Sequence, residues 1–108
     1  MIKVINKHAA DRTVDSLTGT YIGRPSPLGN PFIIGKDGDR TEVISKYKRW
    51  LLLQLARPSK AKDELNRLIE LYNERKELVL ICWCAPAPCH GDVIREFILA
   101  YTAEEETS

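Results

Sequence analysis

The stretch LVLICWC, residues 78–84, decides the fold of this chain. Its successive positions are apolar, so both faces of an extended segment would avoid water, as in the strands of a parallel sheet. The sequence APAPCHGD, residues 85–92, follows directly, and its prolines end the strand. A buried strand of this kind predicts an α/β domain in which helices cover the sheet.

The segments around this strand predict the element order β-β-α-α-β-α. Two β-favouring segments come first, residues 2–6 and 18–23. Apolar residues then recur at helical spacing after Asp39 and after Ser59, two helix-capping residue types, and a last helix begins at Gly91. A strand, a helical crossover and a second strand favour parallel pairing with a right-handed connection. We therefore expect a small Rossmann-like three-layer domain with three to four mostly parallel strands.

The length of 108 residues fits one domain. We place this domain at residues 1–103 and expect the polar end, residues 104–108, to be a disordered tail. A sheet of three or four strands leaves its edges exposed, and a homodimer is one way to shield an edge.

Charge and hydropathy narrow the functional classes. Lys and Arg total 16 and Asp and Glu total 15, a formal net charge of +1. This balance lacks the basic excess of a typical nucleic-acid binder. No apolar run approaches the roughly 20 residues that span a membrane, and the first residues do not have the pattern of a secretory signal. We expect a cytoplasmic protein without membrane contact.

The proline-rich segment RPSPLGNPF, residues 24–32, is the second unusual part of the chain. If the strands on either side of the helical crossover are parallel, this loop and residues 85–92 follow strand ends at the same edge of the sheet. Ligands of open α/β sheets bind at that edge. We expect Arg24 and the helix start at Gly91 to hold an anion, Asn30 to contact the rest of the ligand, and Gly29 to let the backbone approach it.

The clustered cysteines allow a catalytic interpretation. Cys89 lies at the start of a helix beside His90 and Asp92. A helix start lowers the pKa of a thiol and a neighbouring base activates it further. Cys89, His90 and Asp92 are therefore the candidate catalytic residues.

Two other interpretations of the same segment stay open. A metal such as zinc or iron could be held by Cys82, Cys84, Cys89 and His90, although one residue between the first two cysteines is not the usual zinc spacing. Alternatively, the cysteines are buried side chains with no chemistry, because free cysteine is among the most buried residue types. Trp83 is likewise expected in the core.

The strings YIGRPSPLGNPF and LICWCAPAPCHGDVI resemble an uncharacterised family, a domain of unknown function found in bacteria and phages. The resemblance extends from Tyr21 to Phe97. It implies no established activity, but it directs attention to the same two loops. The residues it picks out are Arg24, Pro25, Pro27, Gly29, Asn30, Pro31, Phe32, Cys82, Cys84, Pro88, Cys89, His90, Gly91 and Asp92.

Three functions follow from these patterns. The first is binding of a small anionic, nucleotide-like ligand at the carboxyl edge of the sheet, with hydrolysis or transfer of that ligand left open. The second is a non-enzymatic module that holds a metal through cysteine and histidine or presents a protein-interaction surface. The third is a nucleic-acid accessory protein, which the neutral charge disfavours.

Overall fold

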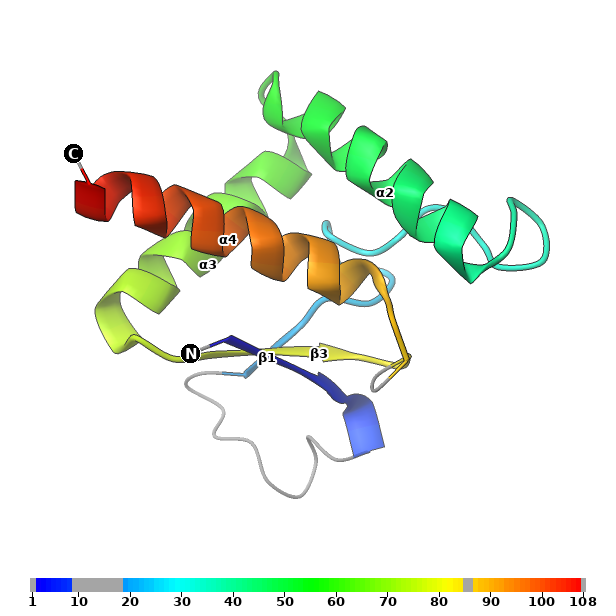
Figure 1. Ribbon diagram of the computed structural model, residues 1–108, viewed down its shortest axis with the longest axis horizontal. Coiled ribbons are helices and arrows are strands. Elements are labelled where there is room, and N and C mark those ends of the chain that lie inside the picture. Colours follow the sequence, from blue (N-terminus) through cyan, green and yellow to red (C-terminus); the bar gives the residue numbers. More distant parts are fainter. Residues whose placement is uncertain (1, 9–18, 85–86, 108) are drawn as a thin grey trace.

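The computed structural model describes residues 2–8, 19–84 and 87–107. Its elements confirm the predicted order β-β-α-α-β-α (Figure 1). They are β1 (Ile2–Asn6), β2 (Gly19–Tyr21), α2 (Arg40–Leu55), α3 (Lys60–Arg75), β3 (Leu78–Cys82) and α4 (His90–Thr107). Helix α4 continues through Thr107, past the domain boundary predicted at residue 103, so most of the predicted tail is helical.

The sheet has three strands in the order β1-β3-β2, and β3 pairs in parallel with both neighbours. Leu80 at the middle of β3 lies opposite Val4 of β1 and opposite Thr20 of β2. The predicted small, parallel α/β sheet is thus confirmed. Since all three strands run the same way, their carboxyl ends meet at one edge.

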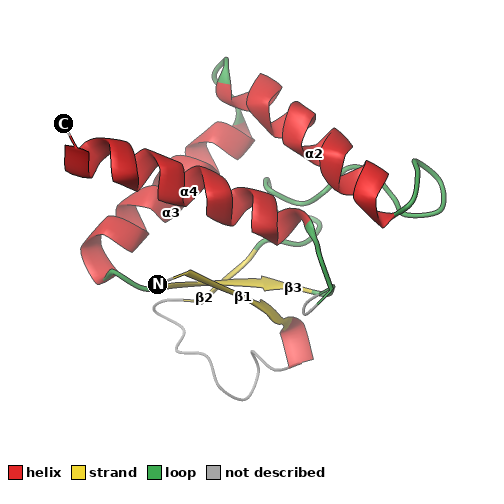
Figure 2. Ribbon diagram, viewed as in Figure 1, coloured by secondary structure: helices red, strands yellow, loops and turns green. Residues whose placement is uncertain are grey.

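The layering differs from the Rossmann-like three-layer arrangement that we expected. Helices α2, α3 and α4 all lie on the same side of the sheet, and α2 packs on α3 and α4 (Figure 2). Leu78, Leu80 and Cys82 are fully buried beneath these helices. The alternate residues of β3 point to the other face, where Val79 is buried and Ile81 is half-buried. The apolar run therefore reflects one fully buried face and one partly buried face.

The helices begin where the sequence predicts, because side chains cap them. The Asp39 carboxylate accepts a hydrogen bond from the Glu42 N–H at 2.9 Å, and the Glu42 carboxylate accepts one from the Asp39 N–H at 3.2 Å. The Ser59 hydroxyl accepts from the Lys62 N–H at 3.1 Å. Within the described part of the chain, none of the helices combines the length and the apolar character that a membrane crossing requires.

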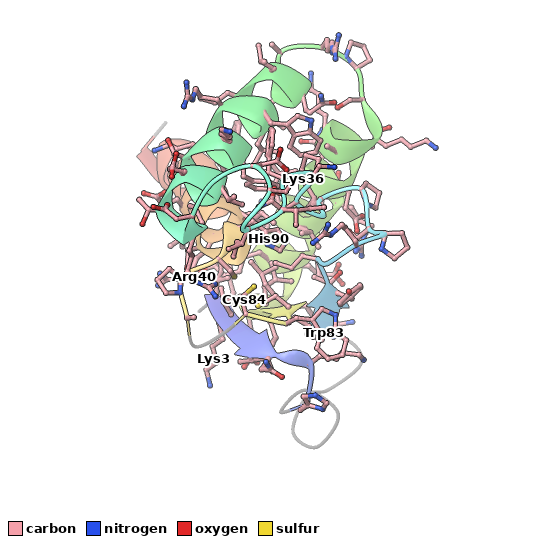
Figure 3. The ribbon with its side chains drawn as sticks, turned by 90° about the vertical axis from the view of Figure 1, so that its right-hand side faces the viewer. Lys3, Lys36, Arg40, Trp83, Cys84 and His90 are labelled. Carbon is pink, nitrogen blue, oxygen red and sulfur yellow. The ribbon has the colours of Figure 1, made fainter. Side chains whose placement is uncertain are left out.

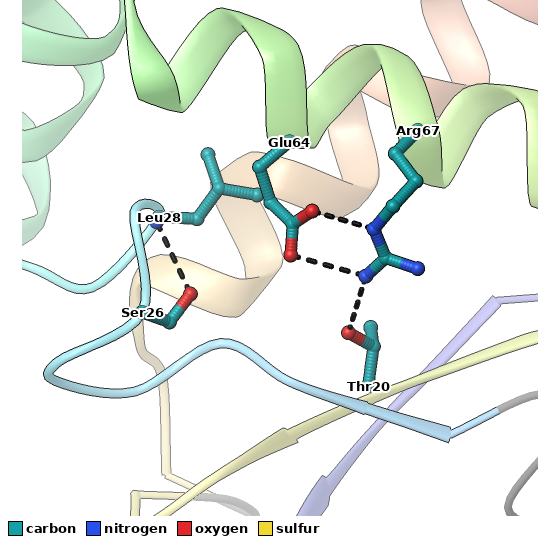
Figure 4. Close-up of polar contacts among 5 residues, drawn as sticks. All are labelled: Thr20, Ser26, Leu28, Glu64 and Arg67. Atoms are coloured by element: carbon teal, nitrogen blue, oxygen red, sulfur yellow. Dashed lines mark hydrogen bonds and ion pairs between the residues drawn. The ribbon is translucent and has the colours of Figure 1, made fainter.

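Arg67 ties α3 to the edge strand β2 (Figure 4). Its guanidinium donates two hydrogen bonds to the Glu64 carboxylate, at 2.6 and 3.0 Å, and a third to the Thr20 hydroxyl at 3.1 Å. The forked contact with Glu64 fixes the plane of the guanidinium. The short strand β2 is thereby held against the helical layer at Thr20, four residues before the proline-rich loop begins at Arg24.

Tyr47 of α2 anchors the proline-rich loop from the helical side. Its hydroxyl donates to the Leu28 carbonyl at 2.7 Å, and both residues are completely buried. The Leu28 N–H donates to the Ser26 hydroxyl at 3.2 Å, so both backbone groups of Leu28 are satisfied (Figure 4). A loop with three prolines in nine residues is in this way held in one shape by the core.

We expect Tyr47→Phe to lower the free energy of unfolding by about 1–3 kcal/mol, because it leaves the buried Leu28 carbonyl without its donor. Urea denaturation followed by circular dichroism measures the change. Tyr101→Phe is the matched control, since Tyr101 is 43% exposed, and should change stability by less than about 0.5 kcal/mol. Equal stability of Tyr47→Phe and wild type would contradict the anchoring role.

Candidate functional site

A cavity of about 270 Å³ opens at the carboxyl edge of the sheet. The proline-rich loop, the start of α2 and the segment after β3 all contribute to it. Figure 3 faces this edge and shows Arg40, Cys84, His90 and Trp83 around the end of the sheet. The lining residues are Gly23, Arg24, Asn30, Phe32, Ile33, Ile34, Arg40, Val43, Ile44, Trp83, Cys84, Pro88, Cys89 and His90. The two loops that the sequence singled out therefore meet.

Two arginines give the cavity its charge. Arg24 comes from the proline-rich loop and is exposed, and Arg40 is the first residue of α2. The Arg40 guanidinium donates to the Pro88 carbonyl at 2.9 Å, which draws it across to the loop after β3. No Asp or Glu is among the described residues that line the cavity. Arg40 was not among the residues predicted from the sequence, where its only signal is the capping residue Asp39, which fixes where α2 begins.

Asn30, which we expected to contact a ligand, lines the cavity, and the oxygen of its side-chain amide is already hydrogen-bonded within the loop. Its Oδ1 accepts a hydrogen bond from the Phe32 N–H at 2.9 Å, which shapes the loop. The carboxamide NH₂ is then the part of Asn30 that can donate to a ligand.

The two glycines predicted to contact the ligand do not line the cavity. A Cβ on Gly29 would lie 3.0 Å from the Arg24 nitrogen and from the Ser26 oxygen, so Gly29 lets the loop close on itself. A Cβ on Gly91 would lie 2.8 Å from a methyl group of Val4, so Gly91 lets α4 pack closely on β1. Both glycines permit close packing within the protein.

Cys89 lines the cavity, but its thiol is not activated. The side chain is 3% exposed, and its sulfur lies 3.5 Å from the Cys82 sulfur. The hydrogen bond with Cys82 and burial strongly raise the pKa of Cys89, and the Gly91 N–H, 3.3 Å from the sulfur, only partly opposes them. These two effects outweigh the lowering of the thiol pKa that we expected from the helix start. Cys89 is therefore a neutral thiol at physiological pH.

Among the three predicted catalytic residues, His90 is the one with an atom that can act as a base. Its Nε2 lies 2.8 Å from the Ile22 carbonyl, which can only accept, so Nε2 carries the proton. Burial lowers the pKa of His90, and the charge of Arg24 lowers it further. The ring is therefore neutral at pH 7, and Nδ1 is left as an acceptor.

Asp92 does not complete a catalytic arrangement with these two residues. Its carboxylate accepts a hydrogen bond from the Cys89 N–H at 3.0 Å, and it does not line the cavity. An acidic side chain that satisfies a free N–H at a helix start has a structural role. The predicted set Cys89, His90 and Asp92 is close in space but does not form a chain from nucleophile to base.

The proposed metal ligands are not assembled either. In residues 2–8, 19–84 and 87–107, no three His, Cys, Asp or Glu side chains are grouped to hold a metal ion. Cys82 is fully buried and its thiol is hydrogen-bonded to that of Cys89. The His90 Nε2 is already hydrogen-bonded to the Ile22 carbonyl. The geometry does not support the metal interpretation based on Cys82, Cys84, Cys89 and His90.

The position of Trp83 differs from the one that we predicted. It is 55% exposed and lines the cavity, although we expected it in the core. Strand β3 ends at Cys82, so the alternation that buries Leu80 and Cys82 beneath α2, α3 and α4 turns the next side chain away from these helices.

Comparisons with known proteins agree with the resemblance noted in the sequence. The family described as Domain of unknown function (DUF4326) matches residues 5–100. An uncharacterised 12.4 kDa protein of Enterobacteria phage T4, from its nrdA-td intergenic region, is 28% identical over 99 residues, which cover 91% of this chain and 78% of the phage protein. No solved structure matches the chain.

We expect iodoacetamide to modify Cys84 first in the folded protein, because Cys84 is half-buried whereas the free thiols of Cys82 and Cys89 are buried and hydrogen-bonded to each other. Peptide mapping by mass spectrometry after brief labelling identifies the site. Labelling in denaturant should reach all three cysteines, and Cys84→Ser should nearly abolish labelling of the folded protein. Native labelling of Cys89 as fast as Cys84 would restore it as a candidate nucleophile.

Stability should fall as the pH drops below about 6.5, the ordinary pKa of histidine, because the unfolded chain then binds a proton that buried His90 resists. The free energy of unfolding from about pH 7.5 to about pH 5.5 should therefore decrease less in His90→Asn than in wild type. His8→Asn is the control, since His8 is exposed. An unchanged pH dependence in His90→Asn would disprove the neutral, buried state.

Proposed function

The chain belongs to the family described as Domain of unknown function (DUF4326), and we propose that it binds a small anionic, nucleotide-like ligand in the cavity. The observation that carries the proposal is the pair of guanidinium groups, Arg24 and Arg40, in a cavity whose described lining has no carboxylate. Guanidinium groups donate paired hydrogen bonds to phosphate or carboxylate oxygens. The position at the carboxyl ends of parallel strands is where α/β sheets bind such ligands.

The charge of the cavity is a local feature. The whole chain carries a net charge of only +1, so long-range attraction for anions is weak. Two guanidinium groups in a described lining without carboxylates create a positive potential inside a concave site, where water screens charges less than on an open surface. This favours a compact ligand with a concentrated negative charge.

The size of the cavity limits the ligand. Its volume of about 270 Å³ lies just below the range of roughly 300–1,000 Å³ that is typical of small-molecule sites. A mononucleotide or a sugar phosphate matches this size better than a dinucleotide. The lining also supplies one neutral polar contact, the amide of Asn30, and an apolar wall that includes Val43 and Ile44.

If the bound ligand is hydrolysed or its phosphoryl group transferred, His90 is the residue that we propose as proton acceptor. Its Nδ1 is unprotonated in the tautomer that the Ile22 bond selects. The Cys89 thiol is held neutral beside Cys82, which argues against a covalent intermediate on that sulfur.

We expect millimolar AMP or ribose 5-phosphate to raise the melting temperature of the wild-type protein, as ligands of the folded state do. Arg24→Ala and Arg40→Ala should each weaken binding about 10- to 100-fold, the effect of losing a hydrogen bond to a charged group. Isothermal titration calorimetry gives the dissociation constants.

Arg57→Ala is the matched control, because it removes an exposed arginine that does not line the cavity. It should bind like the wild type. Circular dichroism checks that each variant is folded. Absence of binding to AMP, ribose 5-phosphate and inorganic phosphate, or full binding by both cavity variants, would refute the proposal.

A further inference from the structure

The exposed indole of Trp83 is held in a fixed orientation. Its Nε1–H donates to the Tyr21 hydroxyl at 2.9 Å, and this hydroxyl donates to the Arg24 carbonyl at 2.9 Å. The Asn6 amide donates to the Trp83 carbonyl at 3.0 Å, which fixes the backbone as well. The His8 ring packs against the indole in a T-shaped contact, with 5.5 Å between ring centroids. A surface tryptophan that merely faces water does not need this set of partners.

The relay from Trp83 through Tyr21 ends on the residue that supplies one of the two cavity arginines. Trp83 and Arg24 both line the cavity, so the position of the indole is coupled to the backbone that carries the guanidinium. Figure 3 shows Trp83 at the β2 side of the sheet end and Arg40 on the opposite side of Cys84. An aromatic surface and a positive group thus border the same opening.

From this arrangement we infer that the cavity selects nucleotides by stacking the base on Trp83, with the phosphate directed to Arg24 and Arg40. The inference rests on the proposed anion binding and adds the ligand class: a mononucleotide with an aromatic base rather than a sugar phosphate. Base–aromatic stacking is strong and tolerates different bases, because every base has a π-face. Ile33 and Ile34, 40% and 47% exposed, also line the cavity and offer apolar contact to a planar base.

Gly23 is a positioning residue for this stacking surface. A Cβ at this position would lie 2.4 Å from the Tyr21 hydroxyl oxygen and 2.6 Å from the ring carbon that bears it. An alanine would therefore displace the Tyr21 hydroxyl from its place between Trp83 and Arg24. The absence of a side chain at Gly23 leaves space for the hydrogen bonds that join Trp83, Tyr21 and Arg24.

Fluorescence tests the inference, because the chain has two tryptophans and Trp50→Phe leaves Trp83 as the sole emitter. AMP, UMP, ribose 5-phosphate and inorganic phosphate are titrated with excitation beyond the absorption of the bases. AMP and UMP should quench Trp83 emission, and the two probes without a base should not. Calorimetry should show AMP binding roughly 5- to 100-fold more tightly than ribose 5-phosphate, the range for one stacked base.

Trp83→Leu should abolish the preference for AMP over ribose 5-phosphate, so that the variant binds both with about the same affinity. Trp83→Phe should retain part of the preference for AMP, and Gly23→Ala should reduce it. Leu53→Ala is the control, because it removes an apolar side chain that is 66% exposed and outside the cavity lining.

The outcomes separate this inference from the proposed function. Equal affinities for AMP and ribose 5-phosphate would overturn base stacking and leave anion binding intact. A Trp83→Leu variant that loses both ligands equally would also overturn it, since the indole would then only support the fold. If none of the four probes binds the wild type, the proposed function fails and the stacking inference fails with it.

Discussion

The parallel pairing of β3 with both of its neighbours is the constraint on which the rest of the molecule depends. Because β3 lies between β1 and β2 and all three strands run the same way, the chain leaves the sheet at one edge after each strand. The proline-rich loop and the segment that begins at Trp83 therefore lie side by side at this edge. The Ile22 N–H donates to the Ile81 carbonyl at 3.0 Å, which extends the pairing of β2 and β3 to the mouth of the cavity.

Most of the unusual residues at this edge serve the scaffold, and a few remain for a ligand. The Asn30 oxygen, the Asp92 carboxylate and the His90 Nε2 are all used by backbone groups of the loops or of α4. Buried or half-buried polar backbone in irregular loops has to be satisfied, and these side chains satisfy it. Arg24, Arg40 and Trp83 also line the cavity, and although Arg40 gives one N–H to the Pro88 carbonyl, a guanidinium has further donors for a ligand.

The sequence predicted the elements well and the chemistry of individual side chains poorly, for physical reasons. Strands and helices follow from local signals such as the cap at Asp39, so their order could be predicted. The state of Cys89 depends on the contact with Cys82, and the place of Arg40 depends on the Pro88 carbonyl 48 residues away. Trp83 is exposed because α2, α3 and α4 all cover the opposite face of the sheet, which a run of apolar residues cannot reveal.

The neutral state of His90 follows from the same arrangement that makes the cavity positive. A charged imidazole would have to be buried beside Arg24, and both burial and that neighbouring charge oppose it. The positive charge of the described cavity lining at pH 7 therefore comes from guanidinium groups, which do not lose their protons in proteins. If the cavity binds a phosphate ester as we propose, protonation of the phosphate itself, rather than of the protein, is the main source of pH dependence in binding near neutrality. The unprotonated His90 Nδ1 then lies in the same cavity as the arginines that we propose to bind the anion, and proton transfer from the attacking water of a bound phosphate ester would require this combination.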